Sequence, residues 1–172
     1  SVAYGASAPT ITPPSSASGG AITYASRDTA VATVTGSTIT LVGAGSTIFT
    51  ATQAADGNYT SATTTTTLTV TAVTPTLTGF ALSSASVAYG ASAPTITPPS
   101  SASGGAITYT SINTAVATVS GSTITLVGAG STIFTATQAA DGNYTSATTT
   151  TTLTVTAVTP TLTGFALSSY GA

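Results

Sequence analysis

The sequence predicts an all-β chain built from two tandem β-sandwich modules of about seven strands each. The first reason is an internal repeat: residues 1–84 align without a gap to residues 86–169, an offset of 85 residues (86 − 1). The second is that helix is disfavoured, because Thr, Ser, Val, Gly and Pro dominate, Glu and Lys are absent, and no segment spaces its apolar residues at i, i+3, i+4. The third is that polar and apolar residues alternate in short runs between turn signals, which indicates strands.

The two copies of the repeat are nearly identical. They differ at four positions, which are Ala25/Thr110, Arg27/Ile112, Asp28/Asn113 and Thr35/Ser120. A catalytic domain is rarely duplicated in this way, whereas a spacer gains length with each added unit. The repeat therefore favours a structural role.

The predicted strands follow one another along each copy. In the first copy they lie around residues 10–12 and 22–24, in a hairpin over 32–43, and over 46–54 and 63–73. Val34, Ile39 and Leu41 alternate with polar residues in the hairpin, so we expect these three side chains to point inward. Asp56-Gly57-Asn58 favours a turn between the last two strands. Residues 74–90 supply the first strand of the second copy.

Charge is almost missing from the sequence. Only 2% of residues are charged, the net charge is −2 and the pI is about 4.1, so we expect no binding of nucleic acid or of an anionic membrane. No apolar run approaches the ~18 residues of a spanning helix, so we expect no membrane insertion. With 41% hydrophobic residues and a mean hydropathy of +0.45, the chain is apolar enough to fold. Because charge keeps protein surfaces apart, its scarcity predicts that the partners are other copies of the chain, or that glycans cover the surface.

The residues that carry most enzyme chemistry are absent. The sequence has no His, no Cys and no Lys, and its only carboxylate side chains are Asp28, Asp56 and Asp141. Asp56 and Asp141 are the same site in different copies, so no catalytic pair of carboxylates is expected within a module. We therefore expect no enzyme activity, no cofactor and no metal site.

Two short motifs have both a functional and a structural interpretation. Asp56-Gly57-Asn58 and Asp141-Gly142-Asn143 offer oxygen ligands to calcium, but a calcium site takes about six to eight oxygens and usually several carboxylates, so a turn is favoured. Asn58-Tyr59-Thr60 and Asn143-Tyr144-Thr145 fit the acceptor pattern for N-linked glycans. The structural alternative, which we favour, is that each Tyr anchors a corner of the sandwich.

Several runs of the second copy resemble a known group of repeats. They are PTLTGFALSSASVAYG (residues 75–90), SGGAITYTSINTAVATVSGSTITLVGAGSTIFTATQAADGNYTSA (103–147) and TTLTV (151–155). Their Tyr-Gly element, VATV segment, GAGS turn and Gln-x-x-x-Gly-x-Tyr element resemble bacterial Ig-like tandem repeats of large surface proteins and adhesins, in the group related to the MBG and Big families. The resemblance covers essentially the whole chain. It implies an Ig-like β-sandwich fold and an extracellular, cell-surface location, and it implies no catalysis.

The same resemblance places the module boundaries. Module 1 spans residues 1–75 and lacks its first strand, module 2 spans residues 76–160, and residues 161–172 repeat the first strand. Either the chain is a cut from a continuous array, or this strand of one copy completes the open edge of the next by donor-strand complementation. The candidate assembly strand consists of Thr161, Leu162, Thr163, Gly164, Phe165, Ala166 and Leu167.

A row of threonines is the second candidate surface. Thr63, Thr65, Thr67, Thr69 and Thr71 share one face of a strand, because side chains alternate with a period of two. Thr40, Thr50 and Thr52 are expected beside them on neighbouring strands. A flat plane of this kind suits ice or a glycan. It also arises wherever a β-branched residue that favours strands faces solvent.

Together these features predict a structural repeat that forms the shaft of an extracellular bacterial adhesin or a self-assembling surface filament. Strand donation between modules or chains is one of the two interpretations of the spare strand, beside a cut from a continuous array. The alternative is a surface-binding module that recognises ice or glycan through its Thr-rich sheet face. An ordered Thr plane with few contacts between chains would favour the alternative.

Overall fold

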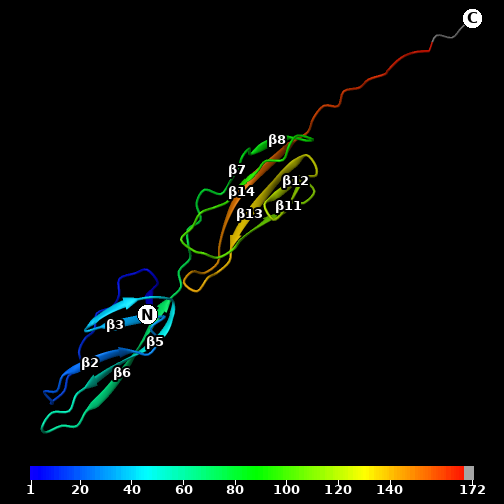
Figure 1. Cartoon of the computed structure of the whole chain (residues 1–172). Helices are drawn as coiled ribbons and strands as arrows, with labels where there is room; N and C mark the ends of the chain where they lie inside the picture. Colours follow the sequence, from blue (N-terminus) through cyan, green and yellow to red (C-terminus); the bar gives the residue numbers. More distant parts are fainter. Residues whose placement is uncertain (169–172) are drawn as a thin grey trace, which may run out of the picture. The chain divides into compact units, whose positions relative to one another are not determined.

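The computed structural model describes residues 1–168. Within them the chain forms strands, turns and extended segments but no helix, so the predicted all-β fold is confirmed. The chain divides into two compact units (Figure 1). Unit 1 comprises residues 1–76, 101–106 and 138–147, and unit 2 comprises the remaining described residues.

Unit 1 is built on a four-stranded sheet. Its strands are β1 (Val2–Ala3), β2 (Ile22–Ser26), β3 (Ala32–Thr35), β4 (Thr38–Leu41), β5 (Gly45–Gln53) and β6 (Ala62–Thr71). The sheet has the order β1-β6-β5-β2, in which β1 runs parallel to β6 and the other pairs are antiparallel. The antiparallel β3–β4 hairpin packs Val34, Ile39 and Leu41 against the buried cluster that contains Phe49 and Leu68. The core of unit 1 therefore lies between the sheet and this single hairpin.

Unit 2 repeats this plan and adds a further pair of strands. Apart from Gln138 and Ala147, which the division above assigns to unit 1, it consists of the strands β7 (Ala81–Leu82), β8 (Ser86–Ala88), β9 (Ile96–Thr97), β10 (Ile107–Ser111), β11 (Ala117–Ser120), β12 (Thr123–Leu126), β13 (Gly130–Gln138) and β14 (Ala147–Thr156). The sheet β10-β13-β14-β8 is accompanied by the β11–β12 hairpin and by the antiparallel β7–β9 pair. Phe80, Leu82 and Ile96, at and beside the β7–β9 pair, pack against the same buried cluster as Val119 and Leu126 of the hairpin. The second layer of unit 2 therefore has two parts.

Most of the predicted strands are confirmed. The hairpin over 32–43 is β3–β4 with the predicted inward residues, and the strands over 22–24, 46–54 and 63–73 are β2, β5 and β6. The segment 74–90 holds two short strands, β7 and β8, which belong to different sheets.

The strand predicted around residues 10–12 is wrong for unit 1. These residues are not in a strand there, whereas their equivalents in unit 2, Ile96–Thr97, form β9. The physical reason is that a strand exists only where its backbone groups have partners, and β7 supplies those partners in unit 2 alone among the described residues.

Unit 1 has no counterpart of the β7–β9 pair among the described residues, and this difference changes the burial of identical residues. Phe49 is 6% exposed and Leu68 is 8% exposed, whereas Phe134 and Leu153 at the same positions of unit 2 are 0% exposed. Unit 2 buries these side chains completely because residues from β7 and β9 cover the cluster. Each lost neighbour removes dispersion contacts, so we expect the core of unit 1 to be the weaker one.

The first prediction compares one substitution at two equivalent positions. Leu153→Ala should destabilise the fold by about 2–5 kcal/mol, because it leaves a cavity in a closed core. Leu68→Ala should fall at or below the low end of that range, because its side chain has fewer neighbours to lose. Urea unfolding of each variant, followed by circular dichroism, measures both losses. Equal losses would contradict an incomplete core in unit 1.

Candidate functional site: an open groove and a free strand

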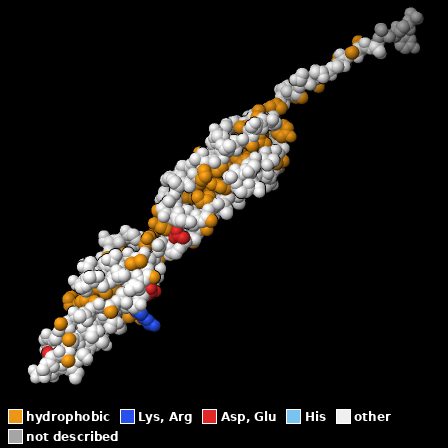
Figure 2. Space-filling model, viewed as in Figure 1, with side chains coloured by type: hydrophobic (Ala, Val, Ile, Leu, Met, Phe, Trp, Pro, Cys, Tyr) orange, Lys and Arg blue, Asp and Glu red, His pale blue; other side chains and the backbone are white. Residues whose placement is uncertain are grey.

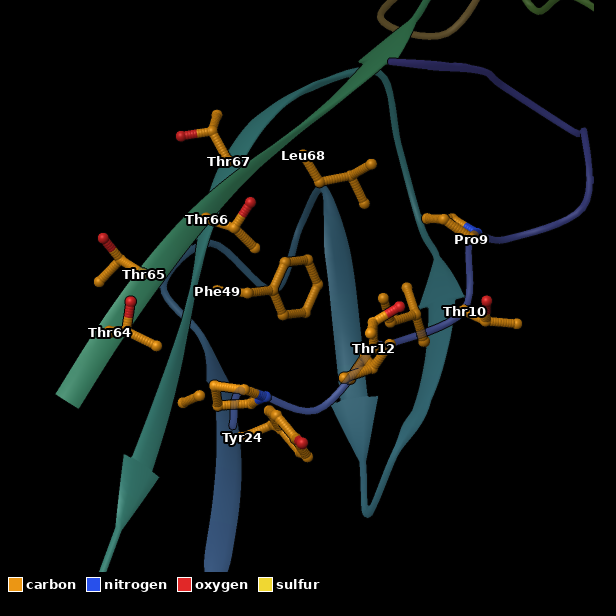
Figure 3. A pocket seen from close by; sticks show the side chains of 14 residues that line it. Pro9, Thr10, Thr12, Tyr24, Phe49, Thr64, Thr65, Thr66, Thr67 and Leu68 are labelled. Carbon is orange, nitrogen blue, oxygen red and sulfur yellow. The ribbon is translucent and has the colours of Figure 1, made fainter. Parts of the chain in front are cut away.

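An apolar groove opens into the core of unit 1. It has a volume of about 450 Å³ and lies between the inner face of the sheet and the extended segment that passes through Pro9 and Thr12. Figure 3 shows Phe49 and Leu68 pointing into this space from the strands. Its lining residues are Pro9, Thr10, Ile11, Thr12, Pro14, Tyr24, Ile39, Phe49, Ala51, Thr64, Thr65, Thr66, Thr67 and Leu68.

In unit 2 an aromatic side chain occupies the corresponding position. Phe80 stacks on Tyr109, with ring centroids 5.8 Å apart and an angle of 22° between the planes. Tyr109 is the equivalent of Tyr24, which lines the groove of unit 1. Phe80 belongs to the segment that leads into β7, and Leu82 on β7 pairs with Ile96 on β9. The groove of unit 1 therefore lies where the segment around β7 would pack.

Residues at the edge of the groove are also more exposed than their equivalents in the second copy. Ala62, Thr64 and Thr66 on β6 are exposed, whereas Ala147, at the first of these positions in the second copy of the repeat, is buried. The equivalents of the two threonines, at positions 149 and 151, are half-buried. The inner face of β6 is thus partly uncovered over its first half, and the inner face of β14 is covered.

The candidate assembly strand lies outside both sandwich cores. Residues 161–168 have no assigned secondary structure and pair with no strand among the described residues. Leu162, Phe165 and Leu167 are 92%, 96% and 90% exposed. Three large apolar side chains are therefore exposed within seven residues. Residues 169–172, the end of the predicted segment 161–172, lie outside the described residues.

The free segment has part of the backbone shape of its strand-paired counterpart, residues 76–82. Gly164 has φ +78°, and Gly79, at the same position before β7, also has φ +78°. Residues other than glycine rarely adopt a positive φ of this size. The segment 161–167 has the same sequence as residues 76–82, so the glycine falls at the same place before the same Phe-Ala-Leu.

The predicted Thr row lies on the face of β6 that turns away from the core. Thr63, Thr65, Thr67 and Thr71 are exposed and Thr69 is half-buried, where its hydroxyl lies 2.9 Å from the hydroxyl of Ser46. The register places Thr63 opposite Thr52, Thr65 opposite Thr50, and Thr52 opposite Thr23. The threonines therefore form rows across three strands. Thr40 is not among them, because it lies on β4 and pairs with Thr33.

Charged side chains are rare on the visible surface of the molecule (Figure 2). Asp56 closes a loop: its Oδ1 accepts the backbone N–H groups of Asn58 and Tyr59 at 2.9 and 3.0 Å. Its Oδ2 accepts the Ser18 hydroxyl and the Gly19 N–H, both at 2.8 Å. Because four donors already surround the carboxylate, the Asp-Gly-Asn motif is a turn, as predicted.

The second copy contains the same set of hydrogen bonds around its aspartate. Asp141 accepts the N–H groups of Asn143 and Tyr144 at 2.9 Å, and the Ser103 hydroxyl and Gly104 N–H at 2.9 Å. In the first copy the side-chain amide of Gln53 adds two bonds to the same loop, to the carbonyls of Ser18 and Gly20. Within residues 1–168 no three His, Cys, Asp or Glu side chains lie close enough together to hold a metal ion.

Hydrogen bonding shifts the titration of both carboxylates. The backbone N–H of Asn58, followed by the hydroxyl of Ser18, lowers the pKa of Asp56 to about 2. The corresponding donors, Asn143 and Ser103, lower the pKa of Asp141 below its ordinary value.

Asn58 in the predicted glycan acceptor is exposed, and its modification stays a prediction.

No helix in the described part of the chain is long and apolar enough to cross a membrane. No family model matches the chain, and no curated protein matches it, so the resemblance to bacterial Ig-like repeats stays a prediction.

Two solved structures of surface proteins are similar to the chain. One is surface layer protein SbsC, domains 4–9, with 24% identity and a TM-score of 0.36. The other is BT4661, a SusE-like surface located polysaccharide binding protein from the Bacteroides thetaiotaomicron heparin utilisation locus, with 16% identity and a TM-score of 0.35. The matches cover 83% and 79% of this chain, which spans only 23% and 29% of theirs. At such TM-scores the likeness carries no argument about binding or assembly.

The second prediction concerns the stability of the fold at acid pH. Because folding lowers the pKa of Asp56, its ionised form stabilises the fold above about pH 4, and this contribution is lost as the pH falls through about 2. We expect the free energy of unfolding to decrease over that window. The double variant Asp56→Asn, Asp141→Asn should be less stable at neutral pH and should lose most of the acid dependence. Denaturant unfolding at stepped pH measures both effects.

Asp28→Asn is the matched control for this experiment. Unit 2 already has Asn113 at the equivalent position, where its side chain accepts the same turn hydrogen bond that Asp28 accepts. The control should therefore keep the stability of the chain at neutral pH. An acid dependence that survives unchanged in the double variant would show that the two loops do not carry it.

Proposed function

We propose that this chain is a structural repeat of an extracellular bacterial adhesin shaft or a self-assembling surface filament, in which a strand of one copy completes a unit of another copy. The observation that carries the proposal is the contrast between two nearly identical sequences in one molecule. Unit 2 has strand β7 in its second layer, unit 1 has a groove there, and a further copy of the β7 segment is free. The proposed occupant of the groove is residues 161–167 of a second copy.

The energetics favour this occupant. Phe80 and Leu82 pack against the core of unit 2, and their equivalents Phe165 and Leu167 are almost fully exposed. Burying a side chain of this size stabilises a complex by about 1.5–3 kcal/mol. The segment also brings backbone pairing: Thr78 and Ser100 exchange two hydrogen bonds of 3.0 and 2.8 Å in unit 2. Insertion of a strand would supply both gains to unit 1.

The composition suits a shaft or filament. With 2% charged residues, copies of the chain repel one another very little and can pack closely. A repeat that is completed by its neighbour adds length without a new kind of joint. The proposal includes no enzyme activity and no cofactor. Its extracellular, cell-surface location follows from the resemblance to bacterial surface repeats.

The third prediction tests assembly. The chain at micromolar concentration should form fibres visible by electron microscopy and elute early in size-exclusion chromatography. Deletion of residues 161–172 should leave a monomer, because the donor is lost and both sandwich cores are kept. A control in which a Gly/Ser segment of equal length replaces these residues should also be monomeric. A monodisperse full-length chain, or fibres from the deletion variant, would contradict strand donation between chains.

One observation favours the alternative, a surface-binding module. The rows Thr23–Thr52–Thr63 and Thr50–Thr65 give the sheet a regular threonine face in the described part of unit 1. As a fourth prediction, Thr50→Lys with Thr65→Lys should abolish ice-growth inhibition or glycan binding if this face is a binding surface, and should leave assembly intact. Retention of binding in this variant, or no binding by the unmodified chain, would reject the alternative.

A further inference from the structure

We propose that the joint between copies has one fixed antiparallel register, in which the Phe165 ring of one copy stacks on Tyr24 of the next and Thr163 lies opposite Ser15. The inference rests on the proposed function and deepens it, because it names the contacts that hold the donated strand. It also fixes how many copies each copy can bind.

The register follows from the pairing inside unit 2. Ala81 pairs with Thr97, Leu82 pairs with Ile96, and Thr78 bridges to Ser100, all antiparallel. Residues 76–83 and 161–168 have the same sequence, and so do residues 93–105 and 8–20. The offset of 85 residues therefore converts these pairs into Ala166 with Thr12, Leu167 with Ile11, and Thr163 with Ser15.

The groove contains the partners that this register requires. Tyr24 lines it at the position where Tyr109 stacks on Phe80, and Phe49 and Leu68 line it where Phe134 and Leu153 are covered in unit 2. Figure 3 shows Tyr24 beside the segment that would pair with the donor, and Phe49 pointing into the same space. An aromatic ring stacked on another adds to the energy of burial alone.

The alternation of side chains makes the register selective. In unit 2 Phe80 and Leu82 are half-buried and Ala81 between them is exposed. A slip of one residue would turn the inward side chains outward and would place Ala166 in the groove. Phe165 would then lie in solvent, so the slipped joint would lose its largest apolar contact.

The proposed joint is directional, because its donor and its acceptor are different segments. The donor is the segment 161–167 and the acceptor is the groove of unit 1, which are different surfaces, so the contact is heterologous. The corresponding position of unit 2 holds its own Phe80 and β7, so unit 2 cannot accept a second strand there. The assembly should be unbranched and polar, either as an open filament or as a ring.

The fifth prediction tests the register by cross-linking. The chain has no Cys, so each introduced thiol is unique. In unit 2 the hydroxyls of Thr78 and Ser100 lie 3.1 Å apart, so cysteines at the equivalent positions of two copies should lie within disulfide distance. Thr163→Cys chains carrying a size tag, mixed with untagged Ser15→Cys chains and oxidised, should give a covalent heterodimer on a denaturing gel.

The control moves the donor thiol by two residues on the same face. Thr161→Cys mixed with Ser15→Cys should give at least tenfold less heterodimer. If fibres form but the control pair cross-links as well as the test pair, the register is overturned while the proposed function stands. If neither pair cross-links and no fibres form, strand donation between chains fails together with the register.

A second pair of variants tests the anchor. Phe165→Asp should raise the concentration needed for assembly at least tenfold, because the charge would enter the apolar groove. Ala166→Asp introduces the same charge at the neighbouring residue, whose equivalent Ala81 is exposed, and should assemble within about threefold of the unmodified chain. Both substitutions lie outside the sandwich cores, so neither should change the fold. Equal effects of the two variants would overturn Phe165 as the inward anchor.

Discussion

The structure depends on closure of a hydrophobic core by a strand that lies far from it in the sequence. In unit 2 the Phe80 ring stacks on Tyr109, and Phe80, Leu82 and Ile96 cover the cluster around Phe134 and Leu153. In unit 1 the same aromatic and aliphatic side chains are present, but the covering strand is not among the described residues, and a groove of about 450 Å³ remains. In unit 1 a sheet and one hairpin form the fold, and the groove lies where unit 2 has the β7–β9 pair.

Because the chain has so few charged residues, the apolar contact between the covering strand and the core matters more. Without long-range ionic forces, recognition between copies has to come from apolar burial and from backbone hydrogen bonds. Threonine provides solvent-facing strand surface that carries no charge, and the few carboxylates serve local turns, as Asp56 and Asp141 do. The joints between copies should therefore depend little on salt concentration. In the proposed joint, specificity comes from strand register and from the fit of one aromatic side chain.

The sequence was sufficient to predict the elements that depend on local pattern. The β3–β4 hairpin, with Val34, Ile39 and Leu41 facing the core, follows from alternation alone. The free strand is also visible in the sequence, because residues 161–167 repeat residues 76–82. The strand at residues 10–12 was predicted wrongly for an instructive reason. Residues 8–20 and 93–105 are identical, yet only the second segment contains a strand, so no local pattern could distinguish them.

The repeat predicted an open edge in module 1, but the composition of the groove was beyond sequence reasoning for the same reason. Its lining combines Pro9, Tyr24, Phe49 and Leu68 from four separate segments, and its emptiness depends on a strand that pairs over a distance. The pairing of β1 with β6, parallel and only two residues long, also has no local signature. Comparison of the two units supplies what the sequence could not, because each position of unit 1 has a counterpart in a closed environment.

The most direct test of the account is a titration of the chain lacking residues 161–172 with a synthetic peptide of residues 160–168, followed by calorimetry and by the NMR signals of Tyr24. The account predicts one peptide bound per chain, a shift of the Tyr24 ring signals, and loss of binding when Phe165 of the peptide is replaced by Ala. No binding, or equal binding of the replaced peptide, would contradict it.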